Sequence, residues 1–363
     1  METAESKYQE TLQSGEEKLL RFLHAFEAVQ EHILLPRMNE VRDQLRTVAD
    51  ETFPQLLDET AALVPPASYS SAHAKLVESI TCCAEASTVF LNGAGRDFPQ
   101  AFLHSRAVWC RGLSLLYEIR AQLPVLRPYW VMPAARSSSA TEEEGTSRSE
   151  PPVGFVHEPA TETHTEYTLY VPEHYTKQKT WPLIVCLHGG YGHGNEYIWT
   201  WLRPAKSSGY LLLSPKSTGP TWSILTPPLD IRSIQAMLAE VCETYAVNYK
   251  QIYLTGLSDG GTFSYLLGFT CAEQFAGIAP IAAEFHPMID PLLRQGKGKE
   301  TPLLVVHGVQ DPIFDIESTR AACALFKRLG YTLTYQELPD WGHAYPYKIN
   351  EQIVLPWFAS LAV

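Results

Sequence analysis

The fold of this chain is decided by the stretch Tyr253-Leu-Thr-Gly256-Leu-Ser258-Asp259-Gly260-Gly261. Residues 251–255 are apolar enough to predict a short buried strand, and residues 262–270 predict a helix. Ser258 therefore falls on the turn between them, with a glycine two residues away on either side. Such a turn projects the serine hydroxyl above the edge of a sheet and leaves the N–H of Asp259 free to face an oxyanion. The positive end of the following helix favours negative charge at the same place.

The motif Gly-x-Ser-x-Gly also occurs in glycine-rich turns of unrelated α/β proteins, so the surrounding elements have to decide. From residue 153 onward the chain alternates strands with helices. Strands are expected at 163–171 (an edge strand), 183–187, 210–213, 251–255, 278–282, 303–306 and 331–336. Helices are expected at 231–245, 262–270, 316–329 and 350–361. This order predicts an α/β unit with a mostly parallel, twisted sheet and helices on both faces.

The first 132 residues have helical periodicity throughout. Four amphipathic helices are expected. The first runs up to Pro36, with a possible capping box at Ser14-Gly-Glu-Glu17, and the second begins at Met38, with Pro54 kinking or restarting it. The third covers about residues 70–92 and the fourth residues 97–123. Short connections suggest an antiparallel bundle. Residues 133–152 are polar and predict a flexible linker, so that 153–363 would form the second domain. The bundle could serve as an interaction surface, an oligomerisation element or a lid.

Composition limits the partners and the compartment. The formal net charge is −12, and acidic residues are spread over both halves of the chain without a basic block. This argues against nucleic acid or an anionic membrane as a partner. Seven cysteines without CxxC spacing favour reduced thiols over a disulfide framework. No signal peptide or membrane-spanning stretch is recognisable, so we expect a cytoplasmic protein.

A second part of the predicted site is His188-Gly-Gly-Tyr-Gly192, directly after the strand at 183–187. Glycines at this position let a backbone N–H approach a ligand at the carboxyl end of the sheet. The N–H of Gly190 or of Tyr191 would form a two-donor oxyanion hole with that of Asp259. A phosphate-binding loop is the alternative, but no Lys-Ser/Thr follows and no GxGxxG is present.

An acid and a base complete the expected catalytic set. Asp311 follows the strand at 303–306 closely and would orient a histidine, with Asp315 and Glu284 as weaker rivals and a turn-forming role as the alternative. If the chain order is nucleophile, acid and then histidine, the base must follow Asp311, and His343 is the only histidine that does. The histidines at 188 and 307 are expected to pack or hydrogen-bond beneath the site. No histidine spacing indicates a metal.

Taken together, the loop 188–192, the serine turn, Asp311 and His343 resemble the α/β-hydrolase superfamily over about residues 160–363. The resemblance is to the polyhydroxybutyrate-depolymerase-like esterases, a group with feruloyl and acetyl-xylan esterases, and to phospholipase/carboxylesterase members. It implies a serine esterase that works through a Ser258–His343–Asp311 triad and an acyl-enzyme, without cofactor or metal. Secreted members carry signal peptides and often disulfides, which this chain lacks, so an extracellular polymer is not the expected substrate. The bundle lies outside the family pattern.

The substrate is expected to be a small ester. Aromatic residues gather in the stretches that would surround the site, and Trp222, Trp341 and Tyr345 are the candidate substrate contacts, although core packing explains such residues equally well. Two other functions remain open at this point. One is a serine peptidase of the same superfamily, because the triad also serves amides. The other is a non-catalytic binding protein on a hydrolase scaffold.

Overall fold

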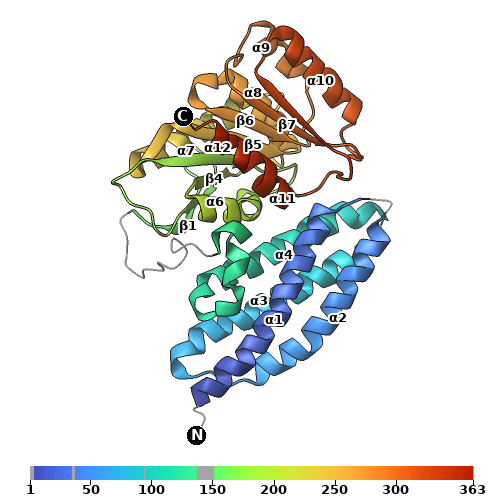
Figure 1. The fold of residues 1–363 in the computed structure, drawn as a ribbon, viewed down its shortest axis with the longest axis vertical. Coiled ribbons are helices and arrows are strands. Elements are labelled where there is room, and N and C mark those ends of the chain that lie inside the picture. The colour runs from blue at the N-terminus through green and yellow to red at the C-terminus, as the bar shows by residue number, and fades with distance from the viewer. Residues whose placement is uncertain (1–3, 35–36, 94, 137–150, 363) are drawn as a thin grey trace. The chain divides into compact units, whose positions relative to one another are not determined.

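The computed structural model describes residues 4–34, 37–93, 95–136 and 151–362 (Figure 1). The chain divides into two compact units, Met1–Pro133 and Ala134–Val363, here called the helical unit and the sheet unit. Most of the linker expected at 133–152 lies outside the described residues.

The described residues of the helical unit form four long helices (Figure 1): α1 (Ala4–Glu31), α2 (Met38–Ala62), α3 (Ser70–Asn92) and α4 (Phe98–Glu118). Short 3-10 helices follow at Arg120–Gln122 and Pro124–Trp130. Phe26 of α1 packs against Phe90 of α3 and Trp109 of α4, with ring centroids 6.1 and 5.5 Å apart. All three side chains are fully buried, so aromatic contacts join the helices into one core.

The structure differs from the expected helices in two places. The capping box predicted at 14–17 is wrong, because α1 already begins at Ala4 and runs through it. Gly15 faces α2 inside the helix, and a Cβ there would lie 2.9 Å from Leu56 Cδ1. The fourth helix ends at Glu118 instead of 123, and the chain continues in 3-10 turns. Pro54 lies inside α2 without ending it.

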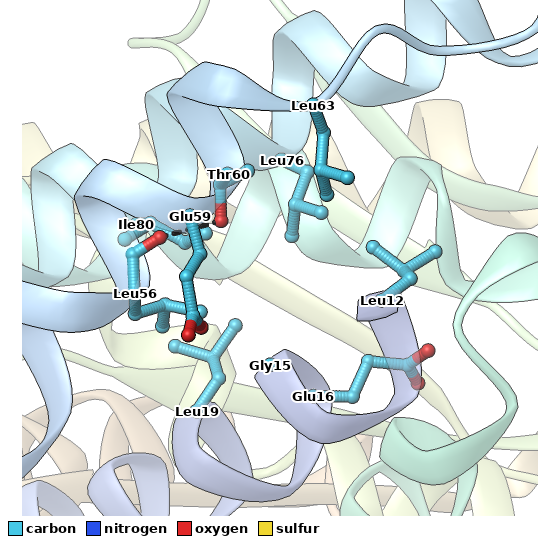
Figure 2. A pocket seen from close by; sticks show the side chains of 10 residues that line it. All are labelled: Leu12, Gly15, Glu16, Leu19, Leu56, Glu59, Thr60, Leu63, Leu76 and Ile80. Atoms are coloured by element: carbon cyan, nitrogen blue, oxygen red, sulfur yellow. Dashed lines mark hydrogen bonds between the residues drawn. The ribbon is translucent and has the colours of Figure 1, made fainter. Parts of the chain in front are cut away.

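A buried carboxylate lies in the helical unit beside a small apolar cavity (Figure 2). Only 3% of Glu16 is exposed, and its Oε2 accepts the backbone N–H of Val125 at 2.8 Å. Burial raises the pKa of Glu16 from 4.5 to about 7, against the opposing effect of N–H donors at Val125 and Leu126. The protonated form is therefore the one that the folded helical unit favours.

We predict that Glu16→Gln removes a pH dependence of stability. Because the folded-state pKa is raised, stability from protonated Glu16 is complete below about 4.5 and is lost as the pH rises through about 7. At pH 8 the variant should exceed the wild type by up to about 3 kcal/mol in free energy of unfolding, and at pH 4 the two should agree. Urea denaturation of the full chain followed by circular dichroism measures this. Exposed Glu17→Gln is the control, and equal pH profiles for wild type and Glu16→Gln would contradict the account.

Across the described residues, the sheet unit holds one eight-stranded sheet in the order β1-β2-β4-β3-β5-β6-β7-β8. The strands are β1 (Gly154–Glu158), β2 (Tyr167–Val171), β3 (Trp181–Leu187), β4 (Leu211–Pro215), β5 (Val247–Leu257), β6 (Gly277–Ile281), β7 (Leu303–Gly308) and β8 (Leu333–Leu338). The pairs β1–β2 and β2–β4 are antiparallel, and all others are parallel. This confirms the predicted mostly parallel sheet.

The edge strand is not the one expected from the sequence. The segment at 163–171 contains β2, which begins only at Tyr167 and is buried along its whole length between two neighbours. The edge on this side of the sheet is β1, whose residues are mostly half-buried, and β8 forms the opposite edge. The sequence also gave no indication of the short helices α5 (Gly194–Tyr197), α6 (Leu202–Ser208) and α9 (Asp290–Arg294).

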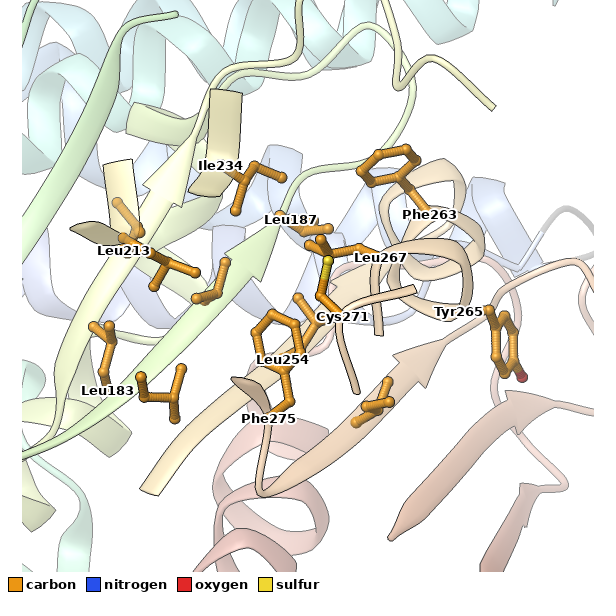
Figure 3. Packing of buried hydrophobic residues seen from close by; sticks show 14 of the residues in the cluster. Leu183, Leu187, Leu213, Ile234, Leu254, Phe263, Tyr265, Leu267, Cys271 and Phe275 are labelled. Carbon is orange, nitrogen blue, oxygen red and sulfur yellow. The ribbon is translucent and has the colours of Figure 1, made fainter. Parts of the chain in front are cut away.

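Three longer helices cover the sheet: α7 (Pro228–Thr244), α8 (Asp259–Thr270) and α10 (Ile316–Leu329). Near residue 350 a continuous helical segment is made of α11 (Tyr347–Ile349), a π-helical turn (Asn350–Val354) and α12 (Leu355–Ser360). Leu254 of β5 packs in one cluster with Phe263 and Leu267 of α8 (Figure 3). The preceding residue, Tyr253, stacks on Phe358 of α12 with ring centroids 4.5 Å apart. Because successive strand residues point to opposite faces, α8 and α12 cover opposite faces of the sheet.

Candidate active site

Ser258 occupies a strained turn between β5 and α8. Its φ is 58° and its ψ is −123°, a conformation that costs a residue with a side chain about 1–3 kcal/mol. The turn is held on both sides, because the N–H of Ser258 donates to Ile281 O at 3.0 Å and its carbonyl accepts the N–H of Thr262 at 2.9 Å. Residues 260–269 of α8 are all buried, so the helix cannot shift to relieve the strain.

The two glycines beside the serine are required by close backbone contacts. A Cβ at Gly256 would lie 2.4 Å from the carbonyl of Gly260. A Cβ at Gly260 would lie 2.3 Å from His188 O and 2.5 Å from Leu187 O, at the end of β3. The turn can therefore lie against β3 only when residue 260 has no side chain.

We predict that Gly260→Ala lowers the free energy of unfolding by more than about 3 kcal/mol, because its Cβ meets backbone that cannot move aside. Gly219→Ala is the matched control, since its Cβ would make only an ordinary contact, 3.5 Å from Thr221 O. Chemical denaturation of both variants measures the difference. A Gly260→Ala protein as stable as Gly219→Ala would contradict the tight turn.

Asp311 and His343 are joined by a hydrogen bond of 2.8 Å between Oδ2 and Nδ1. Asp311 Oδ1 accepts the backbone N–H groups of Ile313 and Phe314 at 2.8 and 3.0 Å. Burial alone would raise the pKa of the Asp311 carboxyl, but the bond from His343, its charge and the two N–H donors together lower it below 3.8. The carboxylate is therefore ionised and oriented to hold the histidine ring.

Neither of the two rival acids forms a hydrogen bond to His343 in the described residues. Asp315 is exposed at the start of α10, and Glu284 is exposed after β6. His307 is buried, with Nε2 2.9 Å from Phe314 O and Nδ1 3.2 Å from the Thr319 hydroxyl. It supports the turn that carries Asp311, in agreement with its expected place beneath the site.

The three groups of the predicted triad follow parallel strands and reach the same edge of the sheet. Ser258 follows β5, Asp311 follows β7 and His343 follows β8, in a sheet where β5, β6, β7 and β8 are consecutive. The loop after β8 folds back over the end of β7. The carbonyl oxygen of Trp341 accepts the N–H of Gln310 at 3.1 Å, and a Cβ at Gly308 would lie 2.2 Å from that same oxygen. This return brings His343 from the outer strand toward the serine.

Among the described residues, the Ser258 hydroxyl makes no hydrogen bond to the His343 ring. Nucleophile and base are often further apart in an enzyme without substrate and move together in the substrate complex. Nε2 of His343 is the ring nitrogen left for the serine, because Nδ1 is bound to Asp311.

The loop 188–192 lies against the serine turn. A Cβ at Gly189 would lie 3.4 Å from Ser258 Cβ, and one at Gly190 would lie 2.6 Å from Asp259 Oδ2. The N–H of Tyr191 already donates to Pro220 O at 2.8 Å, and the Tyr191 side chain is 76% exposed. Of the two expected donors in this loop, Gly190 is thus the one whose N–H is not used by Pro220. Asp259, the other expected donor, lies in the first turn of α8, where backbone N–H groups have no acceptor within the helix.

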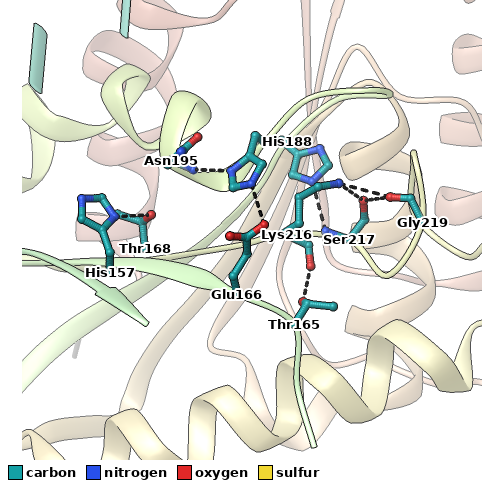
Figure 4. Close-up of polar contacts among 10 residues, drawn as sticks. His157, Thr165, Glu166, Thr168, His188, Asn195, Lys216, Ser217 and Gly219 are labelled. Carbon is teal, nitrogen blue, oxygen red and sulfur yellow. Dashed lines mark hydrogen bonds and ion pairs between the residues drawn. The ribbon is translucent and has the colours of Figure 1, made fainter. Parts of the chain in front are cut away.

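Residues 216–223, here called the brace, contact the loop 188–192 through His188, whose ring lies beside Ser217 (Figure 4). The N–H of Ser217 donates to His188 Nε2 at 3.2 Å, so the ring proton is on Nδ1, which donates to Gly189 O at 2.7 Å. Burial, with a smaller contribution from the Lys216 charge, lowers the pKa of His188 to about 3 and keeps the ring neutral. The histidine is therefore a rigid hydrogen-bonding spacer.

The brace has an anchor of its own. Buried Asp230 accepts the N–H groups of Thr218 and Ser223, each at 2.7 Å. Thr221 donates its hydroxyl to Asp259 Oδ2 at 2.6 Å. Sequence reasoning missed both Asp230 and Thr221, because a loop without regular structure gives no periodicity from which its contacts can be predicted.

The expected aromatic contacts are buried side chains. Trp222 is 2% exposed, donates its indole N–H to His188 O at 2.7 Å and stacks on Phe263. It therefore supports the loop 188–192 through a backbone carbonyl. Trp341 and Tyr345 are 8% and 9% exposed. A substrate-binding role for these two remains a proposal.

Some further features concern the described residues as a whole. None of the groups of His, Cys, Asp and Glu among them is arranged to hold a metal ion. No described helix is long and apolar enough to cross a membrane. The seven cysteines are free thiols.

Comparison with known proteins gives partial matches. No model of a known protein family matches the chain. A stretch of 109 residues, 28% of the chain, is 32% identical to acyl-protein thioesterase 1 of Gibberella zeae and covers 45% of that protein. Another of 161 residues, 42% of the chain, is 24% identical to probable feruloyl esterase C of Aspergillus oryzae and covers 57% of it. The chain thus spans about half the length of the curated relatives it matches.

Among solved structures, S-formylglutathione hydrolase from Staphylococcus aureus matches with a TM-score of 0.49 and 15% identity, over 57% of this chain and 98% of that one.

The sheet unit has the α/β-hydrolase fold: a mostly parallel sheet with helices on both faces and a tight strand–turn–helix element at Ser258, after β5. Its sequence relatives are named esterases and thioesterases. These findings confirm the predicted resemblance to α/β-hydrolase esterases and the predicted fold class.

Proposed function

We propose that the protein is a serine esterase that cleaves carboxylic esters at Ser258. The observation that carries the proposal is the strained serine turn at the same sheet edge as the Asp311–His343 pair. A positive φ at a non-glycine residue persists only where the surrounding structure enforces it, and here it aims the hydroxyl out of the sheet. The names of the sequence relatives support ester chemistry independently.

The reaction would proceed in two steps. His343 Nε2 takes the proton of the Ser258 hydroxyl, while the serine oxygen attacks the ester carbonyl. Asp311 holds the ring through Nδ1 and stabilises the imidazolium that forms. The N–H groups of Gly190 and Asp259 bind the oxyanion, and each such donor contributes about 3–4 kcal/mol of transition-state stabilisation. His343 then protonates the leaving alcohol, and water attacks the acyl-enzyme with the same ring as base.

The compartment belongs to the same proposal. Cys186, Cys271 and Cys323 are buried free thiols in the sheet unit, and burial raises the pKa of each. Protonated, unpaired thiols of this kind are typical of proteins from a reducing compartment. We therefore place the protein in the cytoplasm.

A panel of esters and anilides tests the proposed reaction. Wild type should hydrolyse p-nitrophenyl acetate and butyrate, and Ser258→Ala should lower kcat at least about 10⁴-fold because the acyl-enzyme can no longer form. Exposed Ser208→Ala is the control. Preference for aminoacyl or peptidyl anilides would indicate a peptidase instead, and no turnover by folded wild type would indicate a binding protein.

The choice of the acid is tested separately. Asp311→Asn should lower kcat by about 10⁴-fold with little change in KM, because an amide favours the wrong ring tautomer of His343 and cannot stabilise the imidazolium. Asp315→Asn, at the neighbouring exposed acid, should stay within about twofold of wild type. Steady-state kinetics on p-nitrophenyl butyrate decides, and the reverse pattern would transfer the role of the acid to Asp315.

A further inference from the structure

The residue after the nucleophile carries a carboxylate that is fixed inside the site. Asp259 Oδ2 accepts the hydroxyl of Thr221 at 2.6 Å and lies where a Cβ on Gly190 would be. Within the described part of the chain, Oδ1 has no hydrogen-bond partner, and the residue is partly exposed. Thr221 is thus a positioning residue that holds one of the two carboxylate oxygens.

This carboxylate is close to the reacting carbonyl. Bond lengths keep every carboxylate oxygen of an aspartate within about 5 Å of its own backbone nitrogen. In the proposed mechanism the N–H of Asp259 binds the oxyanion, so the charge lies within about 8 Å of that oxygen. At such a separation a unit charge acts on another charge with an appreciable energy unless water or a counter-ion screens it.

In the described residues Asp259 forms no ion pair with a basic group. The nearby lysine, Lys216, directs Nζ to Ser217 Oγ and Gly219 O at 3.3 and 3.2 Å (Figure 4). His188 is neutral, and the His343 ring is held by Asp311.

Among the ionisable groups that follow the parallel strands, two acids add to this sign, whereas Lys216, directly after β4, opposes it. Glu284 after β6 and Asp315 after β7 are exposed acids at the same sheet edge. Arg294 is paired with Asp290 at 2.5 Å, so it adds no net positive charge. The three acids Asp259, Glu284 and Asp315 outnumber Lys216, so the net charge of these groups is negative, and a charged substrate meets their field near the serine.

We propose that Asp259 is a specificity-determining residue that selects cationic and neutral esters and rejects anionic ones. The inference rests on the proposed esterase function and specifies the substrate class of that same site. A quaternary or primary ammonium on the ester would lie in the field of the unpaired carboxylate oxygen. A carboxylate on the ester would be repelled both on binding and when the oxyanion forms.

Three thioesters of one acid test the inference. They are the S-butyryl esters of thiocholine, of its neutral isostere neohexanethiol and of mercaptopropionate, and the released thiol is measured with Ellman's reagent. In wild type at low salt, kcat/KM should be about tenfold higher for the cation than for the neutral ester, and about tenfold lower for the anion. The ratios of kcat/KM for cationic to neutral ester and for anionic to neutral ester should both approach one as the ionic strength rises.

Asp259→Asn keeps the shape of the side chain and removes its charge. Both ratios should then fall to within about twofold of one, whatever happens to the absolute rates. Glu284→Gln is the matched control, because it removes one acid from the same edge and should leave the ratios within about twofold of wild type. Thermal melting of both variants verifies that they are folded.

The outcomes separate the two proposals. Hydrolysis of the neutral thioester that depends on Ser258 but shows no charge preference would overturn this inference and leave the esterase intact. The same holds if Asp259→Asn and Glu284→Gln change the ratios equally, since a general field would then be responsible. Absence of any turnover of the neutral thioester and of p-nitrophenyl butyrate by folded wild type would overturn the esterase, and with it the inference.

Discussion

The site depends on a single constraint, the left-handed turn at Ser258. A residue with a side chain adopts φ of 58° only when both flanks are fixed, and here β5 is a central strand and α8 is buried along nearly its whole length. Gly256 and Gly260 let the two flanks touch, with no room for a Cβ. The packing of β5 and α8 therefore compensates the backbone strain at Ser258 and fixes the position of its side chain. The strain lies at the place where the reaction is proposed to occur, as is common for functional residues.

The remaining groups are placed by loops that return over the sheet edge. The loop after β8 is held to the end of β7 through Trp341 O, and this brings His343 against Asp311. The brace at 216–223 is hydrogen-bonded to the loop 188–192, because Ser217 and Trp222 both donate to His188. It is also bonded to Asp259 through the hydroxyl of Thr221. Both loops are fixed by a network of hydrogen bonds, to backbone groups and between the side chains of Thr221 and Asp259 and of His343 and Asp311.

The sequence predicts those parts of this arrangement that depend on local pattern. The strand before Ser258 and the helix after it are predictable because a continuous apolar run and a helical repeat meet at two glycines, and His343 follows from chain order alone. The stretch Ser14–Glu17 resembles a capping box, but the helix runs through it, so this local motif does not predict that α1 begins at Ala4. Nor does the sequence say that the N–H of Tyr191 is used by Pro220, or that Trp222 is buried, because both depend on the path of the brace. Tertiary contacts of irregular loops have no periodic signature.

The central claim is that the Ser258 hydroxyl is an activated nucleophile, and covalent labelling tests it most directly. The full-length protein is treated with a fluorophosphonate, digested and mapped by peptide mass spectrometry, with His343→Ala alongside. The account predicts one phosphonyl adduct, on Ser258, and none on the His343→Ala protein. A folded wild-type protein that stays unlabelled, or an adduct on a different serine, would contradict it.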